Sequence, residues 1–185
     1  MTRMTISTGL LLLALSTGVN SQDISDYAKW RGREIKALSD QQIADLREGK
    51  GMGLSLPAEL NGAPGPLHAL EMHRTLRISD PQAAELERIV AHMRTTAQRL
   101  GHEVIRAERD LDNAFRTGQV DEQSIDELTR QAALLNGQLR AEHLKAHLQT
   151  RQLLSREQIA AYDQARGYSG TAADGNASSS GHRHR

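Results

Sequence analysis

The chain has 185 residues, 23 basic and 23 acidic side chains, and no cysteine. A formal net charge of zero provides no overall attraction to nucleic acid, so we expect no nucleic-acid partner. The lack of cysteine excludes disulfides, thiolate catalysis and cysteine-based zinc sites. Aromatic residues make up only 3% of the sequence, which favours long helices around a thin aliphatic core in a single domain.

Residues 1–21 have the pattern of an export signal peptide. Arg3 supplies positive charge, and an apolar stretch follows from Gly9 to Val19. That stretch is shorter than the ~20 residues that a membrane-spanning helix needs. We therefore predict cleavage near Ser21/Gln22, release into the periplasm and no stable membrane span, with an uncleaved membrane anchor as the alternative.

The mature domain is predicted to cover residues 22–168. Residues 22–37 are polar and irregular, with Tyr27 and Trp30 as their apolar anchors. A short helix is expected over 40–47, followed by Gly- and Pro-rich loops around a helical turn at 57–60. Pro66 then begins a helix that is predicted to continue to about Arg77.

An antiparallel helical hairpin forms the predicted core. Its first helix follows Ser79, ends near Arg116 and is closed by Gly118; its partner begins at Asp121 or Ser124 and ends near Leu153. Apolar residues recur at alternating spacings of four and three, as in a coiled-coil seam. The seam positions are Leu86, Val90, Met93, Ala97, Leu100, Val104, Ala107, Leu111 and Ala114, facing Ile125, Leu128, Ala132, Leu135, Leu139 and Ala146. A shorter helix over 156–166 follows.

The second hairpin helix carries another apolar stripe, on the side opposite Leu139. At 100° per residue, this stripe collects Leu134, Gly137, Ala141, Leu144 and Leu148. A helix that is apolar on two sides needs two partners. The second partner is either the set of short flanking helices, a second protomer or an unfolded client protein. Residues 169–185 lose all periodicity and are predicted to be a disordered tail.

A short motif recurs immediately before three of the predicted helices. It reads Leu38-Ser39-Asp40-Gln41-Gln42, Ile78-Ser79-Asp80-Pro81-Gln82 and Leu154-Ser155-Arg156-Glu157-Gln158. The serine suits an N-cap, and the glutamine three residues later suits the reciprocal bond of a capping box.

These boxes, the signal peptide and the long hairpin resemble the Spy/CpxP (LTxxQ-motif) family of periplasmic proteins, over roughly residues 25–168. The Gly51-Met52-Gly53 loop and the segment from Glu59 to His68 are similar to a subgroup of periplasmic heavy-metal sensors related to ZraP and CnrX. The resemblance implies an all-α fold of four to five helices and a homodimer. It also implies a role in envelope stress, either as an ATP-independent chaperone or as a metal sensor that reports to a membrane signalling partner.

The candidate metal ligands are His143, His147 and Met93. The two histidines are spaced i, i+4 on one helix face, and the hairpin register places Met93 at their height. This set suits a transition metal such as Zn, Cu or Ni. Alternatively, the histidines are solvated at the helix edge and Met93 fills the core. His68 with Met72 and His73, and the tail pair His182 and His184, are weaker candidates.

Catalysis finds little support in the sequence. His143 and His147 match the outer positions of a zinc-protease HExxH motif, but the general-base glutamate is missing from the Leu144-Lys145-Ala146 segment between them. We therefore expect a protein that is not an enzyme and requires no cofactor. The expected client-binding residues are Leu134, Ala141, Leu144 and Leu148.

Overall fold

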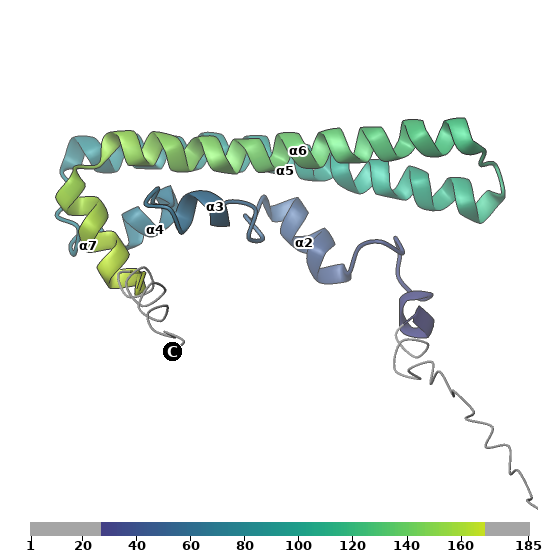
Figure 1. Ribbon diagram of the computed structural model, residues 1–185, viewed down its shortest axis with the longest axis horizontal. Helices are drawn as coiled ribbons and strands as arrows, with labels where there is room; N and C mark the ends of the chain where they lie inside the picture. Colours follow the sequence, from purple (N-terminus) through teal and green to yellow (C-terminus); the bar gives the residue numbers. More distant parts are fainter. Residues whose placement is uncertain (1–26, 169–185) are drawn as a thin grey trace, which may run out of the picture. The chain divides into compact units, whose positions relative to one another are not determined.

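The computed structural model describes residues 27–168, which are mostly helical and contain no strand (Figure 1). The predicted signal peptide and tail lie outside these residues. The chain divides into two compact units, Met1–Arg33 and Glu34–Arg185. In the described part of the first unit, the Tyr27 and Trp30 rings meet edge to face at 5.2 Å, and the Arg33 guanidinium lies 4.9 Å from the centre of the Trp30 ring. Within residues 27–168, no helix has the length and apolarity needed to cross a membrane.

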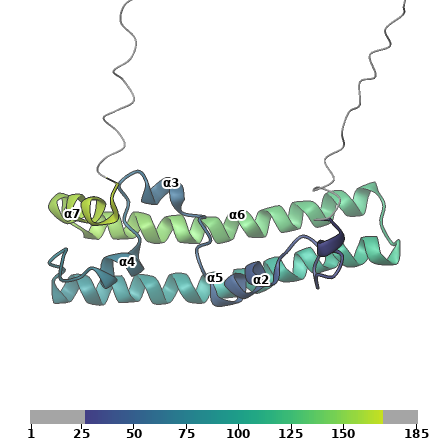
Figure 2. The same ribbon diagram turned by 90° about the horizontal axis from the view of Figure 1, so that it is seen from below.

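The second unit is built on the predicted hairpin, in which α5 (Asp80–Thr117) and α6 (Glu122–Leu153) lie side by side and antiparallel (Figures 1 and 2). Gly118 ends α5 in the left-handed conformation at φ 68°, where a residue without a Cβ is favoured. The Asp121 side chain caps α6 by accepting from the backbone N–H of Ser124 at 2.8 Å. The all-helical prediction and the hairpin are therefore confirmed.

The seam of the hairpin follows the predicted spacing. Its buried members are Leu86, Ala97, Leu100, Val104 and Ala107 from α5, and Ala132, Leu139 and Ala146 from α6. The prediction missed Ile89, Gly101 and Ile105, which are also buried. Gly101 and Ile105 are buried because a further helix covers a second face of α5.

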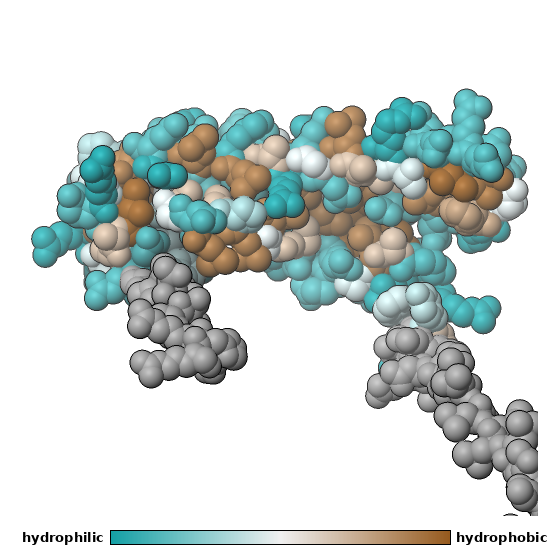
Figure 3. Space-filling model, viewed as in Figure 1, coloured by the Kyte–Doolittle hydropathy of each residue, from teal (hydrophilic) through white to brown (hydrophobic). Residues whose placement is uncertain are grey.

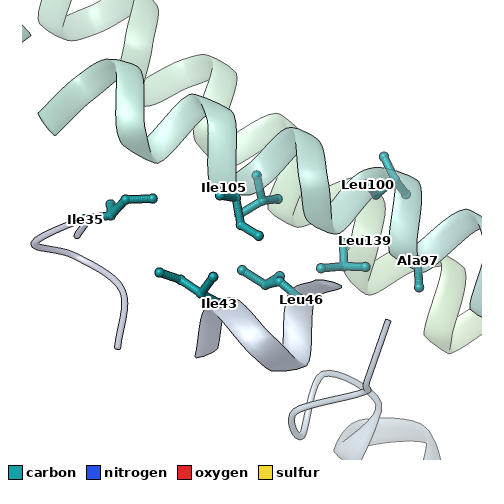
Figure 4. Packing of buried hydrophobic residues seen from close by; sticks show 8 residues of the cluster. Ile35, Ile43, Leu46, Ala97, Leu100, Ile105 and Leu139 are labelled. Carbon is teal, nitrogen blue, oxygen red and sulfur yellow. The ribbon is translucent and has the colours of Figure 1, made fainter. Parts of the chain in front are cut away.

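That helix is α2 (Asp40–Glu48), which packs its apolar side against α5 (Figure 4). Ile43 and Leu46 are each 4% exposed and pack in one cluster with Leu100 and Ile105. Gly101 permits this approach, since a Cβ at that position would lie 2.1 Å from the carbonyl oxygen of Leu46. Ile35 joins the same cluster and is fully buried.

Ile35 also corrects the prediction for residues 22–37. Tyr27 and Trp30 were expected to be the apolar anchors, but their residues are 67% and 40% exposed. Ile35 is the anchor, because the turn over 31–38 inserts it between α2 and α5. An exposed ion pair between Glu34 and Arg109 at 2.6 Å and a hydrogen bond from the Lys36 backbone N–H to Asp112 flank it.

Three short helices complete the unit: α3 (Leu56–Glu59), α4 (Pro66–Glu71) and α7 (Arg156–Arg166). The prediction that the helix after Pro66 continues to about Arg77 is wrong, since α4 ends at Glu71. Residues 72–77 form turns instead, which bury Leu76 in one cluster with Leu86 and Tyr162. Arg77 takes a positive φ of 50° at the reversal before α5.

All three predicted boxes are formed, with Ser39, Ser79 and Ser155 as N-caps. The second and third boxes also contact each other. Gln82 Nε2 donates to Gln158 Oε1 at 2.9 Å, and Gln158 Nε2 donates back to Gln82 Oε1 at 3.0 Å. Gln82 donates in addition to the carbonyl of Leu153 at 3.0 Å. We call this pair the glutamine clasp, which joins the start of α5 to the start of α7.

Candidate functional site

The two histidines of α6 are buried, with His143 3% and His147 7% exposed. The alternative that both are solvated at the helix edge is therefore wrong. They are covered because the loop after α2 and the segment before α4 cross this face of α6. Gly51 lies over the His143 ring, and a Cβ at Gly65 would come within 3.2 Å of His147 Cε1.

A cavity of about 650 Å³ brings the predicted metal ligands together. Met93 lines it from α5, His143 and His147 line it from α6, and His68 lines it from α4. Met93 and the two histidines thus line the same cavity from the two hairpin helices. His92, one residue from Met93, is exposed.

Hydrogen bonds fix the state of one imidazole. His147 Nδ1 lies 2.8 Å from the carbonyl oxygen of Ala63. A carbonyl only accepts, so Nδ1 carries the proton and, in the neutral ring, Nε2 keeps its lone pair. This arrangement, with a backbone carbonyl behind the ring, is common among metal-binding histidines.

The other imidazole holds a buried nitrogen without a partner. His143 Nε2 is inaccessible to solvent and has no hydrogen-bond partner among the described residues. Burial lowers the pKa of His143 below its ordinary value, and repulsion from His147 lowers it further. The ring is therefore neutral at pH 7. An unpaired buried nitrogen costs free energy, on the order of 1–3 kcal/mol, unless a ligand or water satisfies it.

Of the three histidines that line the cavity, His143 and His147 lie one turn apart on α6, and His68 lies on α4. Within residues 27–168, no group of three or more His, Asp or Glu side chains is placed to hold a metal ion. His68 Nδ1 pairs with Glu71 Oε2 at 2.8 Å on the outer side of α4. Met72 and His73 do not extend the site, since Met72 packs against the cluster around α7 and His73 is exposed. The tail histidines lie outside the described residues.

Next to the cavity lies a buried carboxylate that sequence reasoning missed. Glu59 is 6% exposed and accepts hydrogen bonds from the hydroxyls of Tyr162 at 2.6 Å and Tyr168 at 3.1 Å. Its other oxygen accepts from the Gly65 backbone N–H at 3.1 Å and lies 3.6 Å from His147 Nδ1. We call these contacts the Glu59 network. It joins the end of α3 to α7 and to the histidine side of α6.

The Glu59 network also sets the ionisation of a tyrosine. Burial raises the pKa of Tyr162 well above its ordinary value, and the bond to Glu59 raises it further. The hydroxyl therefore stays protonated and remains a donor. No sequence signal marks Glu59, because the two tyrosines that donate to its carboxylate lie more than 100 residues away.

The predicted client-binding residues lie on the outer side of α6, and we call them the α6 stripe: Leu134, Ala141, Leu144 and Leu148. Leu134 is 60% and Leu148 52% exposed, while Ala141 and Leu144 are half-buried. α2 and α4 pack mainly on α5, and although α3 packs on α6, the two leucines remain exposed. Apolar side chains accordingly interrupt the hydrophilic surface over α6 in Figure 3.

A second exposed apolar group, missed by sequence reasoning, lies around α3. Its members are Met52, Leu56, Leu60 and Leu67. Met52 has a positive φ of 44° between two glycines, so the loop turns sharply there. We call this group the α3 patch.

Comparison with known families decides which group the chain belongs to. The family model described as LTXXQ motif family protein matches residues 67–166, from α4 to the end of α7. The chain belongs to the LTXXQ motif family. It is thus a Spy/CpxP-like protein at the level of the family, whose members are typically periplasmic. No curated protein and no solved structure matches the chain.

Proposed function

We propose that this LTXXQ-family protein is a non-enzymatic periplasmic chaperone that binds unfolded client proteins without ATP. Clients dock their apolar side chains on the α6 stripe, and the working unit is a homodimer. The observation that carries the proposal is the exposure of Leu134 and Leu148 on the outer side of a long, well-packed helix.

Each exposed leucine of the α6 stripe offers an apolar contact to a client protein. Burying one leucine side chain stabilises a complex by about 1.5–3 kcal/mol. A few such contacts give binding that is useful yet reversible. Exposed Arg140 and Lys145 stand among the stripe residues, and charges at this spacing limit the tightness of any one complex. Weak, non-directional contacts suit a protein that must hold many sequences and release them.

Light scattering from an aggregating client protein tests this proposal. The variant Leu134→Glu plus Leu148→Glu places two charges on exposed positions, so the fold is retained. Losing two leucine contacts, about 3 kcal/mol or more in total, weakens client binding by at least about 100-fold. The matched control, Gln138→Glu plus Gln149→Glu, adds the same charge at exposed polar positions of α6 while keeping both leucines, so suppression of aggregation should be retained.

Two results would contradict the proposal. One is unchanged suppression by a folded Leu134→Glu plus Leu148→Glu variant. The other is loss of suppression only in Leu56→Glu plus Leu60→Glu, which would place client binding on the α3 patch. Analytical ultracentrifugation of the wild-type protein and of these variants measures their mass in solution, which should be that of a homodimer.

A second candidate function is metal binding, as in a sensor or buffer coupled to a membrane signalling partner. The observation that favours it is the cavity in which Met93, His143 and His147 meet, with a buried His143 Nε2 that has no partner. Calorimetric titration with Zn, Ni and Cu tests it. Binding that disappears in His143→Ala plus His147→Ala supports this function. Binding that disappears only in His182→Ala plus His184→Ala assigns it to the tail and removes the candidate.

A further inference from the structure

The sequence contains two Asn-Gly pairs, at residues 61–62 in the loop after α3 and at residues 136–137 in the middle of α6. Because glycine has no Cβ, its backbone nitrogen is open to attack the side chain of a preceding asparagine, so this pair deamidates more readily than others. We propose that Asn61 is a site of spontaneous deamidation to isoaspartate, and that this modification uncovers His147. The modification needs neither client binding nor a bound metal.

The reaction at Asn61 consumes only water. The backbone nitrogen of Gly62 loses its proton and bonds to Asn61 Cγ, while the Cγ–Nδ2 bond breaks and Nδ2 leaves as ammonia. Water then opens the cyclic succinimide at one of two bonds. Breaking the bond between the Gly62 nitrogen and Cγ gives aspartate. Breaking the bond between that nitrogen and the backbone carbonyl carbon of residue 61 gives isoaspartate, whose backbone is longer by one carbon.

The two Asn-Gly pairs differ in their backbone and not in their surroundings. Both asparagines are exposed, and each Nδ2 donates to the carbonyl four residues earlier, that of Pro57 at 2.8 Å and that of Ala132 at 2.9 Å. Nothing lies within 4 Å of a Cβ built on either glycine. Gly137, however, lies inside α6, where the helical hydrogen bonds engage its N–H and fix the backbone. The ring cannot close there unless the helix opens locally.

The backbone nitrogen of Gly62 has no such restraint. It lies in a turn outside α3 with a φ of 73°, and its N–H makes no hydrogen bond to any other described residue. It can therefore approach Asn61 Cγ without breaking a backbone bond of its own. The exposed bond from Asn61 Nδ2 to the Pro57 carbonyl is given up, and water replaces such a bond at little cost. Asn61 thus reacts in the folded protein, whereas Asn136 does not.

The segment that follows Gly62 covers His147. The Ala63 N–H donates to the Ala58 carbonyl at 3.0 Å, and the Ala63 carbonyl accepts from His147 Nδ1 at 2.8 Å. An isoaspartate at position 61 puts an additional backbone carbon inside the turn from Ala58 to Ala63. The Ala63 backbone must shift to accommodate it, so His147 loses the carbonyl that covers its Nδ1 and becomes accessible.

Peptide mass spectrometry tests the modification. The mature chain is incubated at mildly alkaline pH, either folded or in urea, and then digested with trypsin, which places Asn61 in residues 51–74 and Asn136 in residues 131–140. In the folded chain, Asn61 should convert at least about tenfold faster than Asn136, because α6 must open before Asn136 can react. In urea the two should convert at similar rates. Isoaspartate is identified by its methylation with an isoaspartate-specific methyltransferase.

Two results would overturn the site. One is equal conversion of Asn61 and Asn136 in the folded chain, and the other is conversion of Asn61 only in urea. The variant Asn61→Gln is the control, because its longer side chain closes the corresponding ring much more slowly. It should remove the modified form of residues 51–74 and leave the reaction of Asn136 in urea unchanged.

Diethyl pyrocarbonate, which modifies accessible imidazoles, tests whether His147 is uncovered. Trypsin separates His147, in residues 146–151, from His143, in residues 141–145. Labelling of His147 should rise in proportion to the fraction of isoaspartate at position 61. His143 should stay protected, since it lies under the separate loop that carries Gly51.

The freshly purified variant Asn61→Asp is the matched control for the uncovering of His147. It introduces the new charge without the additional backbone carbon, so it should leave the labelling of His147 unchanged. Equal labelling of His147 in Asn61→Asp and in the isoaspartate form would overturn the role of the longer backbone. Isoaspartate without increased labelling of His147, or with an equal increase at His143, would overturn the local uncovering.

Discussion

Two short helices dock on the α5–α6 hairpin at different positions, and each begins with the same serine–glutamine box. At the Ser39 box, which starts α2, Gln42 Oε1 accepts from the backbone N–H of its own cap at 2.8 Å. At the Ser155 box, which starts α7, Gln158 makes this bond and also joins Gln82 in the glutamine clasp. One sequence motif therefore serves as a local cap in one place and as a tertiary contact in the other.

The different roles of the two boxes reflect the contacts that hold α2 and α7 on the hairpin. α2 docks through aliphatic side chains and the close approach at Gly101. α7 adds polar contacts to its apolar cluster around Tyr162, since the clasp and the Glu59 network both end on it. Apolar burial is proportional to area and tolerates small shifts, whereas buried polar bonds demand correct partners. The two helices should thus respond differently to substitution.

The largest effect is expected at the α2 contact. Gly101→Ala places a Cβ 2.1 Å from the Leu46 carbonyl oxygen and should lower the free energy of unfolding by about 2–3 kcal/mol, because backbone must move. Gly137→Ala is the matched control: nothing lies within 4 Å of its added Cβ, so better helix propensity should raise stability by about 1 kcal/mol. Urea unfolding followed by circular dichroism measures both. Equal changes in the free energy of unfolding of Gly101→Ala and Gly137→Ala would contradict the close packing of α2 on α5 at Gly101.

At the α7 side, Tyr162→Phe removes the donor to Glu59 at 2.6 Å and should cost about 1.5–2 kcal/mol. The raised pKa of Tyr162 adds a pH dependence. Above the ordinary tyrosine pKa of 10.0, the unfolded chain loses this proton while the folded chain keeps it. Stability is therefore complete below pH 10 and falls above it, by up to ~1.4 kcal/mol per pH unit.

The variant Tyr162→Phe should lack this alkaline loss, so the difference between the two stability curves narrows above pH 10. Contributions from other titrating groups are common to both proteins and cancel in the difference. A constant difference from pH 8 to pH 11 would show that the Tyr162 hydroxyl ionises normally in the fold.

A smaller effect is expected for the glutamine clasp. Gln82→Ala and Gln158→Ala each remove one half of a reciprocal pair, so a double-mutant cycle should give a coupling of about 1 kcal/mol. The free energies in the cycle come from the midpoints of urea unfolding, provided that the dependence of the free energy of unfolding on urea concentration is the same in all variants. Additive losses would mean that the two glutamines act as separate caps.

The smallest effect is expected at the Ser39 box. Gln42→Ala removes one capping bond on an exposed surface and should cost about 0.5 kcal/mol. Combined with Gln158→Ala, its effect should add without coupling, since the two sites share no partner. A coupling energy between Gln42 and Gln158 as large as that between Gln82 and Gln158 would contradict the view that the Ser39 box is only a local cap.

Most of the fold follows from local sequence patterns. The spacing of four and three along Leu86 to Ala107 predicts the hairpin, and Gly118 marks its turn. Local patterns failed where tertiary contacts decide the outcome. The helix after Pro66 ends at Glu71 because burial of Leu76 overrides helix propensity, and Ile35 is an anchor because α2 and α5 enclose it.

The candidate site was predictable only in part. The i, i+4 spacing of His143 and His147, together with the hairpin register, predicts their meeting with Met93. Their burial was not predictable, since it depends on the loops that carry Gly51 and Gly65 across α6. The Glu59 network gives no local signal either, because Tyr162 and Tyr168 lie more than 100 residues further along the chain.

The glutamine clasp has a consequence for the lifetime of the folded protein. Its two residues are 76 positions apart, so closing them early in folding would require a large loss of chain entropy. We expect the clasp to close after the hairpin has formed, and so after the folding transition state. Contacts that form late slow unfolding and leave the folding rate nearly unchanged. We therefore expect the clasp to slow unfolding and to lengthen the time that each molecule stays folded.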